Sequence, residues 1–189
     1  MEDNYIKFKN NNLLNYFTEK ELERIDEIKD LVVRAYVIAY TVFKDKKDKA
    51  GKPYFEHLFR VSLKLDEEIE QTAALLHDIV EDTEVTFKDL LEIGFPVDVV
   101  EIVKLVTKPE IDTSNMTKEE KLKLYSDEID GIIESGNIHA IRLKKADMSD
   151  NYNKERLKDL PLDKQQWFEE KYGKQLVKLN KVTERDRIL

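Results

Sequence analysis

Apolar residues recur at three- and four-residue steps along most of this 189-residue chain, and strict alternation of apolar and polar residues is almost absent. Steps of three and four place apolar side chains on one face of an α-helix, whereas alternation places them on one face of a strand. Only five Gly and four Pro are present, so few residues interrupt helices. The sequence therefore predicts an all-α fold, built from helices on short connections.

Capping patterns and helix-breaking residues predict where these helices begin and end. Thr18 followed by Glu21 fits a capping box, and the apolar pattern continues to about Phe43, so we expect one long helix over residues 18–43. The polar segment of residues 44–53 contains five lysines and is expected to form an exposed loop.

No repeat, low-complexity tract or Pro/Ser-rich linker divides the chain, and a hydrophobic fraction of 41% is enough to build one core. We therefore expect a loose arm over residues 1–17, one domain over residues 18–182 and a charged tail over residues 183–189.

The composition excludes several classes of partner and site. A net charge of −8 disfavours a nucleic acid duplex, because neutralising phosphates supplies most non-specific affinity. No apolar run approaches the roughly 20 residues that span a bilayer, and the first residues lack a secretory signal, so we expect a cytoplasmic protein without a membrane partner. Because the chain has no Cys, any metal must be held by His and carboxylates. The oligomeric state is not predicted.

Four polar residues follow an apolar helical stretch in the segment AALLHDIVEDTE. His77 and Glu81 are four residues apart, as are Asp78 and Asp82, so each pair projects from one side of a helix. Ionisable groups in apolar surroundings are costly unless they are paired or bind a ligand. A rim of one imidazole and three carboxylates favours a cation.

His57 on the preceding helix and Asp147 on a later one extend this rim. His57 faces it if the two helices pack antiparallel, and Asp147 supplies another oxygen. Mixed imidazole and carboxylate donors suit Mn, Fe or Zn better than Mg or Ca. Taken alone, an isolated His-Asp pair is common on helices, and His57 could be an ordinary half-buried histidine. His139 fits no part of the pattern and is interpreted as a surface or packing residue.

The residues His57, His77, Asp78 and Asp147 resemble the H…HD…D pattern of HD-superfamily phosphohydrolases. More specifically, the segments GKPYFEH, LLHDIVEDT, LVTK and KKADMSDN are similar to motifs in the hydrolase domain of RelA/SpoT homologues and in small alarmone hydrolases. Those enzymes remove pyrophosphate from the 3′ position of (p)ppGpp using Mn(II). The resemblance spans about residues 35–177 and implies a single-domain HD-type helical bundle that acts on a small phosphorylated nucleotide.

The resemblance also implies roles for individual residues. One divalent transition metal, most plausibly Mn(II), would be bound by His57, His77, Asp78 and Asp147 and would activate water. Glu81 and Asp82 correspond to the catalytic pair that orients this water and takes its proton. The alternative for this pair is a structural role at a helix end.

Three further residues are expected to bind the substrate. Asn151 lies four residues after Asp147, on the same helical face, and could hold a ribose or phosphate oxygen. Lys49 and Lys121 would supply positive charge to the polyphosphate, as Lys144 could. For each lysine, a solvated surface position is an equal alternative.

The chain departs from the family pattern in two places. Aligned without gaps, Asp48 replaces the arginine of an Arg-Lys-Ser-Gly run that binds the guanosine nucleotide, while Lys49 is retained. Residues 148–150 are Met-Ser-Asp, where the family usually has Arg-Leu-His or Lys-Leu-Tyr. The metal ligands are therefore better matched than the residues that would recognise guanine.

Three functions remain open from the sequence. The first is a metal-dependent pyrophosphohydrolase of the alarmone type. The second keeps the metal and the phosphoester chemistry but acts on another nucleotide, for example a nucleoside phosphate or the 2′-phosphate of NADPH. The third is a non-catalytic helical interaction module, against which the intact Glu81 and Asp82 pair argues.

Overall fold

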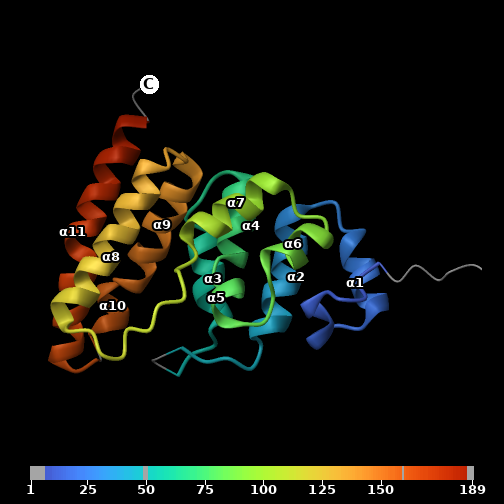
Figure 1. Cartoon of the computed structure of the whole chain (residues 1–189), viewed down its shortest axis with the longest axis horizontal. Helices are drawn as coiled ribbons and strands as arrows, with labels where there is room; N and C mark the ends of the chain where they lie inside the picture. The colour runs from blue at the N-terminus through green and yellow to red at the C-terminus, as the bar shows by residue number, and fades with distance from the viewer. Residues whose placement is uncertain (1–6, 49–50, 159, 187–189) are drawn as a thin grey trace, which may run out of the picture.

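The computed structural model describes residues 7–48, 51–158 and 160–186, and helices dominate these segments (Figure 1). No β-strand occurs in them beyond an isolated bridge between Lys47 and Pro53, so the all-α prediction is confirmed. In chain order the helices are η1 (Asn12–Asn15), α1 (Glu19–Asp26), α2 (Leu31–Phe43), α3 (Phe55–Ser62), α4 (Glu68–Leu76), α5 (Ile79–Asp82), α6 (Phe87–Glu92), α7 (Val97–Val106), α8 (Lys118–Glu134), α9 (Ile138–Asn151), α10 (Lys154–Leu157) and α11 (Leu162–Asp186).

Helix α4 is surrounded by other helices of the core. Its residues from Thr72 to Leu76 are all buried, and it packs against α2, α3, α7 and α9. Apolar burial is the main favourable contribution to folding, so this helix anchors the core. The residues that directly follow it, His77 and Asp78, are held in place by the same packing.

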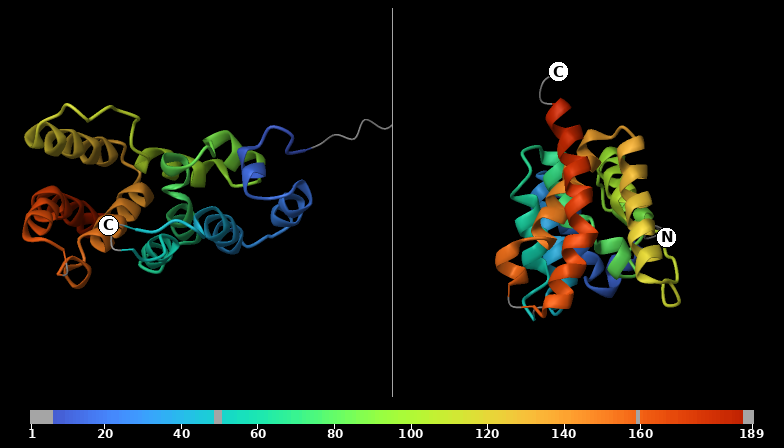
Figure 2. Two further views of the ribbon diagram at one scale, coloured as in Figure 1. Left: turned by 90° about the horizontal axis from the view of Figure 1, so that it is seen from below. Right: turned by 90° about the vertical axis from the view of Figure 1, so that its left-hand side faces the viewer.

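Helix α9 connects two groups of helices that can be seen in Figure 2: one contains α3, α4 and α7, and the other contains α8 and α11. It packs against α3, α4 and α7 on one side and against α8 and α11 on the other. Because His57 belongs to α3 and Asp147 belongs to α9, the packing of these helices brings together side chains that are far apart in the sequence.

The single long helix predicted over residues 18–43 is wrong, because the chain breaks between α1 and α2. Both ends of the break have a physical cause. The Asp30 side chain accepts a hydrogen bond from the backbone nitrogen of Val33 and so caps α2. Buried Arg34 donates to the backbone carbonyls of Asp26 and Ile28, which satisfies groups that a continuous helix would have used internally.

The N-terminal arm is packed over its described part, contrary to the prediction of a loose segment. Phe8, Leu13 and Phe17 are buried in the core, and the side-chain amide of Asn11 donates to the carbonyl of Asp89. The sequence did not predict this packing, because the apolar residues of the arm are too sparse to show helical periodicity. Residues 1–6 lie outside the described part of the chain.

The charged tail predicted over residues 183–189 is also ordered where the structure describes it. Helix α11 continues to Asp186, and Thr183 on it is buried. Residues 187–189 lie outside the described segments. A search of the described helices for one long and apolar enough to cross a membrane finds none.

Candidate active site

The His-Asp pair lies at a junction between two helices. Helix α4 ends at Leu76, α5 begins at Ile79, and His77 and Asp78 form the turn between them. The backbone nitrogen of Asp82 donates a 3.0 Å hydrogen bond to the carbonyl of Asp78, the residue that caps the start of α5. The sequence predicted that the residues from His77 to Asp82 lie on one continuous helix, and the structure differs because the helix is interrupted at His77 and Asp78.

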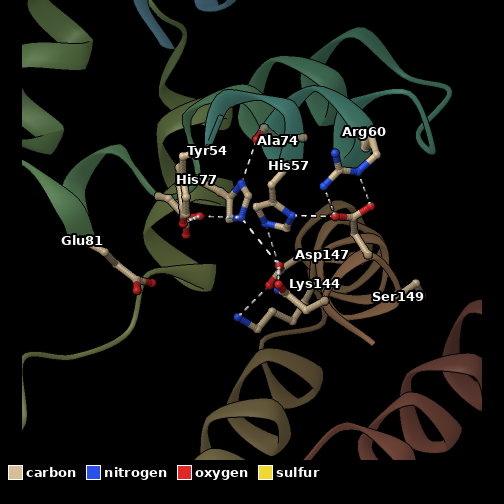
Figure 3. A network of polar contacts seen from close by, with 12 residues as sticks. Tyr54, His57, Arg60, Ala74, His77, Glu81, Lys144, Asp147 and Ser149 are labelled. Atoms are coloured by element: carbon tan, nitrogen blue, oxygen red, sulfur yellow. Dashed lines mark hydrogen bonds and ion pairs between the residues drawn. The ribbon is translucent and has the colours of Figure 1, made fainter. Parts of the chain in front are cut away.

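Four predicted metal ligands come together beside this junction (Figure 3). Candidate ligand atoms of His57, His77 and Asp78 all lie within 4.8 Å of one another. Asp147 Oδ1 lies 3.4 Å from His57 Nε2 and 3.8 Å from His77 Nε2. All four residues are buried, with exposed fractions of 4–8%.

The ring of His77 is oriented for ligation. Its Nδ1 donates a 2.7 Å hydrogen bond to the carbonyl of Ala74, so in the neutral ring that binds a metal the lone pair is on Nε2. Nε2 is buried and has no hydrogen-bond partner among the described residues. A buried polar atom without a partner is rare in native proteins. This nitrogen faces the carboxylates of Asp78 and Asp147, so the residues fit a bound cation.

The electrostatics of the cluster also favour positive charge. Burial lowers the pKa of His77, but the carboxylates of Asp78 and Asp147 outweigh it and raise the pKa to about 9. Burial opposes ionisation of Asp147, but Lys144 and the two imidazoles hold the pKa of this carboxyl well below its usual value. Two ionised carboxylates facing two imidazoles produce the field that a divalent cation requires.

Tyr54 is a neighbour of the cluster to which the sequence assigned no role. Its hydroxyl donates a short hydrogen bond to Asp78 Oδ2. Burial, followed by the nearby carboxylate of Asp78, raises the pKa of Tyr54 far above its usual value, so the phenol stays protonated and acts as the donor. Tyr54 therefore orients one of the candidate ligands.

The predicted catalytic pair lies to one side of the cluster, and each member is bound to a lysine. Glu81 accepts 2.8 Å hydrogen bonds from both the backbone nitrogen and Nζ of Lys108. Asp82 forms a 2.7 Å ion pair with Lys46. In Figure 3 the side chain of Glu81 lies apart from the rings of His57 and His77.

A cavity of 430 Å³ opens over the cluster. Small-ligand sites typically have volumes of about 300–1,000 Å³. The lining includes the candidate ligands His57, Asp78 and Asp147 together with Asp82. Positive charge comes from Lys46, Lys47, Lys108, Lys144 and Lys171, and aromatic surface comes from Tyr54, Tyr125, Phe168 and Tyr172.

The substrate-binding residues predicted from the sequence are only partly near this cavity. Asn151 lines it, and its amide donates to Asp147 Oδ1. Lys121 is not among the lining residues. Lys49 lies outside the described residues. Among the lysines that line the cavity, Lys144 is one that the sequence offers as a possible substrate-binding residue. Lys108 has no predicted role, although it is the last residue of the LVTK segment on which the resemblance partly depends.

The loop before α3 supplies two lysines that the ungapped alignment overlooked. The backbone nitrogen of Asp48 donates to the carbonyl of Lys52, and a positive φ of 80° at Gly51 closes the turn. Lys46 lies before the turn with Nζ 4.2 Å from the centroid of the Tyr54 ring. Lys46 and Lys47 therefore bring positive charge to the cavity.

His139 lies outside the cluster. Its Nδ1 is 2.9 Å from a carboxylate oxygen of Glu70, which also binds Arg142. This agrees with its interpretation as a packing residue.

Comparison with known proteins identifies relatives of this chain. The sequence profile of the HD domain matches residues 53–160. The chain is 33% identical over 157 residues to a probable guanosine-3′,5′-bis(diphosphate) 3′-pyrophosphohydrolase of Mycoplasma genitalium, covering 79% of this chain and 20% of the relative. It is 32% identical over 158 residues to the guanosine-3′,5′-bis(diphosphate) 3′-pyrophosphohydrolase MESH1 of Drosophila melanogaster, covering 78% of this chain and 80% of MESH1.

The chain thus spans about a fifth of the bacterial relative and most of the fly protein. Among solved structures, a metazoan orthologue of SpoT, described as hydrolysing ppGpp, superposes with a TM-score of 0.60 at 23% identity. The match covers 86% of this chain and 98% of the other. This likeness shows a common fold.

Proposed function

The chain belongs to the HD domain family, and we propose that it is a metal-dependent phosphohydrolase that removes pyrophosphate from the 3′ position of guanosine 3′,5′-bis(diphosphate). The observation that carries the proposal is the buried cluster of His57, His77, Asp78 and Asp147 below a lysine-lined cavity. The names of the fly and bacterial relatives support this substrate.

His57, His77, Asp78 and Asp147 would hold one divalent ion. Their mixture of imidazole and carboxylate donors suits Mn, Fe or Zn better than Mg or Ca, and we propose Mn(II). When bound, the ion would supply Lewis-acid activation of water and of a phosphoryl oxygen. Tyr54 and Asn151 would keep the two carboxylate ligands in position through their hydrogen bonds to Asp78 and Asp147.

Glu81 and Asp82 would orient the attacking water and take its proton. Both carboxylates are bound to lysines, and these lysines, Lys108 and Lys46, also line the cavity. Anionic phosphates would compete with the carboxylates for the same ammonium groups, because each lysine carries only a single positive charge. Binding of a polyphosphate would therefore loosen the two ion pairs and leave the carboxylates available to accept a proton.

The cavity offers separate surfaces for the two parts of a nucleotide. Its lysines produce a locally positive field in a chain whose net charge is −8. Tyr125 and Tyr172 pack edge to face with ring centroids 5.6 Å apart, and Phe168 stacks on Tyr172. We propose that the polyphosphate lies against the lysines and the base against this aromatic surface. Lys49 and Lys121 remain predicted substrate-binding residues.

A panel of substrates tests the proposal directly. The purified chain, loaded with Mn²⁺, is incubated separately with ppGpp, with nucleoside phosphates and with NADPH, and released pyrophosphate and phosphate are measured. Pyrophosphate release from ppGpp at the highest kcat/KM supports the proposal. NADPH belongs in the panel because the cavity's cations are lysines, which bind phosphate but do not stack on a purine as arginine does. Phosphate release from NADPH at a higher kcat/KM would contradict the proposed substrate.

A further inference from the structure

A further buried aspartate lies behind the metal-ligand cluster, on the far side of the His57 ring. Asp150, on α9, is 1% exposed. Its Oδ2 accepts a 2.8 Å hydrogen bond from His57 Nδ1. His57 and Arg60, both labelled in Figure 3, donate hydrogen bonds to this carboxylate.

The two nitrogens of His57 therefore have different partners. Nδ1 is bonded to Asp150, whereas Nε2 lies 3.4 Å from Asp147 within the cluster. Because a carboxylate can only accept, the bond assigns a proton to Nδ1 and leaves Nε2 as the atom that can bind a metal. A carboxylate behind a ligating histidine fixes the ring and makes the other nitrogen more basic.

Positive charges on α3 and in the turn that follows it surround the buried carboxylate of Asp150. Arg60 donates from Nε and Nη2 to the two oxygens of Asp150, both at 3.0 Å, and Lys64 Nζ lies 3.3 Å away. A buried carboxylate is strongly unfavourable unless it is paired in this way, and the bidentate geometry is the strongest form of pairing. His57 and Arg60 lie on α3, and Lys64 lies in the turn that directly follows the helix, so this end of α3 supplies all three donors.

We propose that Asp150 is a positioning residue for the metal site, which holds His57 with Nε2 directed at the ion, and that Arg60 and Lys64 hold the carboxylate of Asp150 against the His57 ring. This inference rests on the proposed metal site but adds residues to which neither the sequence motif nor the comparisons give a role. Asp150 lies in the Met-Ser-Asp segment where the chain departs from the family pattern.

Metal binding, measured without substrate, tests the proposal. The full chain is stripped of metal and titrated with Zn²⁺ in competition with a chelator. We expect Asp150→Asn to lower the Zn²⁺ affinity about 10- to 100-fold, as loss of such a partner usually does. Arg60→Gln keeps the bond between Asp150 and His57 and should lower the affinity less.

Glu70→Gln is the matched control. Glu70 is 2% exposed and, like Asp150, binds a histidine Nδ1 and an arginine, yet it lies away from the cluster. We expect it to lower thermal stability as Asp150→Asn does, without changing the Zn²⁺ affinity of the cluster. Any Zn²⁺ bound by Glu67, Glu70 and His139, whose ligand atoms lie within 4.8 Å of one another, is a separate site in the titration. Equal losses of affinity in Asp150→Asn and Glu70→Gln, or none in either, would overturn the role of Asp150.

A measurement on the parent protein keeps the proposal testable if Asp150→Asn does not fold. The chain contains only three histidines, so the imidazole signals of the Zn²⁺-loaded protein can be assigned by NMR. We expect a proton on Nδ1 of His57 and the metal on Nε2; the reverse arrangement would refute the proposal. A parent chain that binds no Zn²⁺ would overturn the metal site itself, whereas a parent that binds normally with an unaffected Asp150→Asn variant would overturn the positioning role alone.

Discussion

Glu81 and Lys108 are joined twice, because Glu81 accepts one hydrogen bond from the Lys108 backbone nitrogen and one from its Nζ, both at 2.8 Å. The two bonds connect α5 to the segment that follows α7, across 27 positions of sequence. The backbone bond does not depend on the side chain of Lys108. Glu81 therefore keeps a defined place when Nζ turns toward a ligand.

The first prediction concerns the carboxylate pair. Glu81→Gln and Asp82→Asn keep the shape of each side chain but remove its capacity to take a proton. We expect turnover to fall by about 10²-fold or more in each variant, the usual contribution of a positioned general base. Metal content, determined by elemental analysis, should stay at the level of the parent. Turnover equal to that of the parent in both variants would assign the pair a structural role.

The second prediction concerns the proposed metal ligands. His77→Ala and Asp78→Ala each remove one of four buried donors, so the ion should be lost together with hydrolysis. Elemental analysis of the purified variants measures this loss. His139→Ala is the control, because His139 forms a second group of candidate ligand atoms with Glu67 and Glu70, and an unchanged metal content in this variant would show that the ion is held by the cluster. Full metal occupancy in both ligand variants would exclude these residues as ligands.

The sequence predicted the helical class, the helix start at Thr18 and the four residues of the cluster, because these depend on local periodicity, capping and spacing. The capping box at Thr18 is present in the structure. What the sequence missed depends on tertiary contacts. Arg34 also donates to the carbonyls of Ile93 and Gly94, so the break between α1 and α2 is stabilised by residues about 60 positions away.

The same reason explains what was missed at the candidate site. The role of Asp150 requires α3 and α9 to pack together across 93 positions of sequence. In the sequence, Lys46 and Lys47 could not be distinguished from the other lysines of their loop, whereas in the structure both line the cavity. Composition alone therefore identifies a cationic loop but not its cavity-lining residues.

The third prediction concerns the packed arm. Phe8 is fully buried, and truncating a buried Phe to Ala typically costs about 3–5 kcal/mol through lost burial and the cavity left behind. We expect Phe8→Ala to lower the free energy of unfolding in urea by this amount. Lys9→Ala, at an exposed neighbouring position, is the control and should change it by less than about 0.5 kcal/mol. Equal stability of Phe8→Ala and the parent would restore the description of the arm as loose.

The fourth prediction concerns the turn at Gly94. Its φ of 86° lies in the region that disfavours side chains, and an added Cβ would lie 2.7 Å from Nη1 of Arg34. Gly94→Ala should therefore destabilise the chain by about 1–3 kcal/mol, since it adds backbone strain and displaces a buried guanidinium. Gly131→Ala is the matched control, because it lies within α8 and an added Cβ there meets open space. Thermal unfolding of both variants distinguishes the two sites, and a Gly94→Ala variant as stable as the parent would contradict the prediction.

The last prediction separates substrate binding from chemistry in the lysine loop. Lys47 is an exposed residue at the cavity, and its removal should raise KM for ppGpp while leaving kcat similar, because its charge acts on bound substrate and transition state alike. Lys46 also forms the ion pair with Asp82, so Lys46→Ala should raise KM and also change kcat, because it removes the partner that positions this carboxylate. A hydrogen bond to a charged group contributes about 1.5–3 kcal/mol, which corresponds to roughly a 10- to 100-fold rise in KM for each variant.

Lys44→Ala, in the same loop but absent from the cavity lining, is the matched control and should leave both parameters unchanged. Because these contacts are partly solvent-exposed, the rise caused by Lys47→Ala should shrink as ionic strength increases. Equal kinetic constants in the Lys44, Lys46 and Lys47 variants would show that the polyphosphate is bound elsewhere in the cavity.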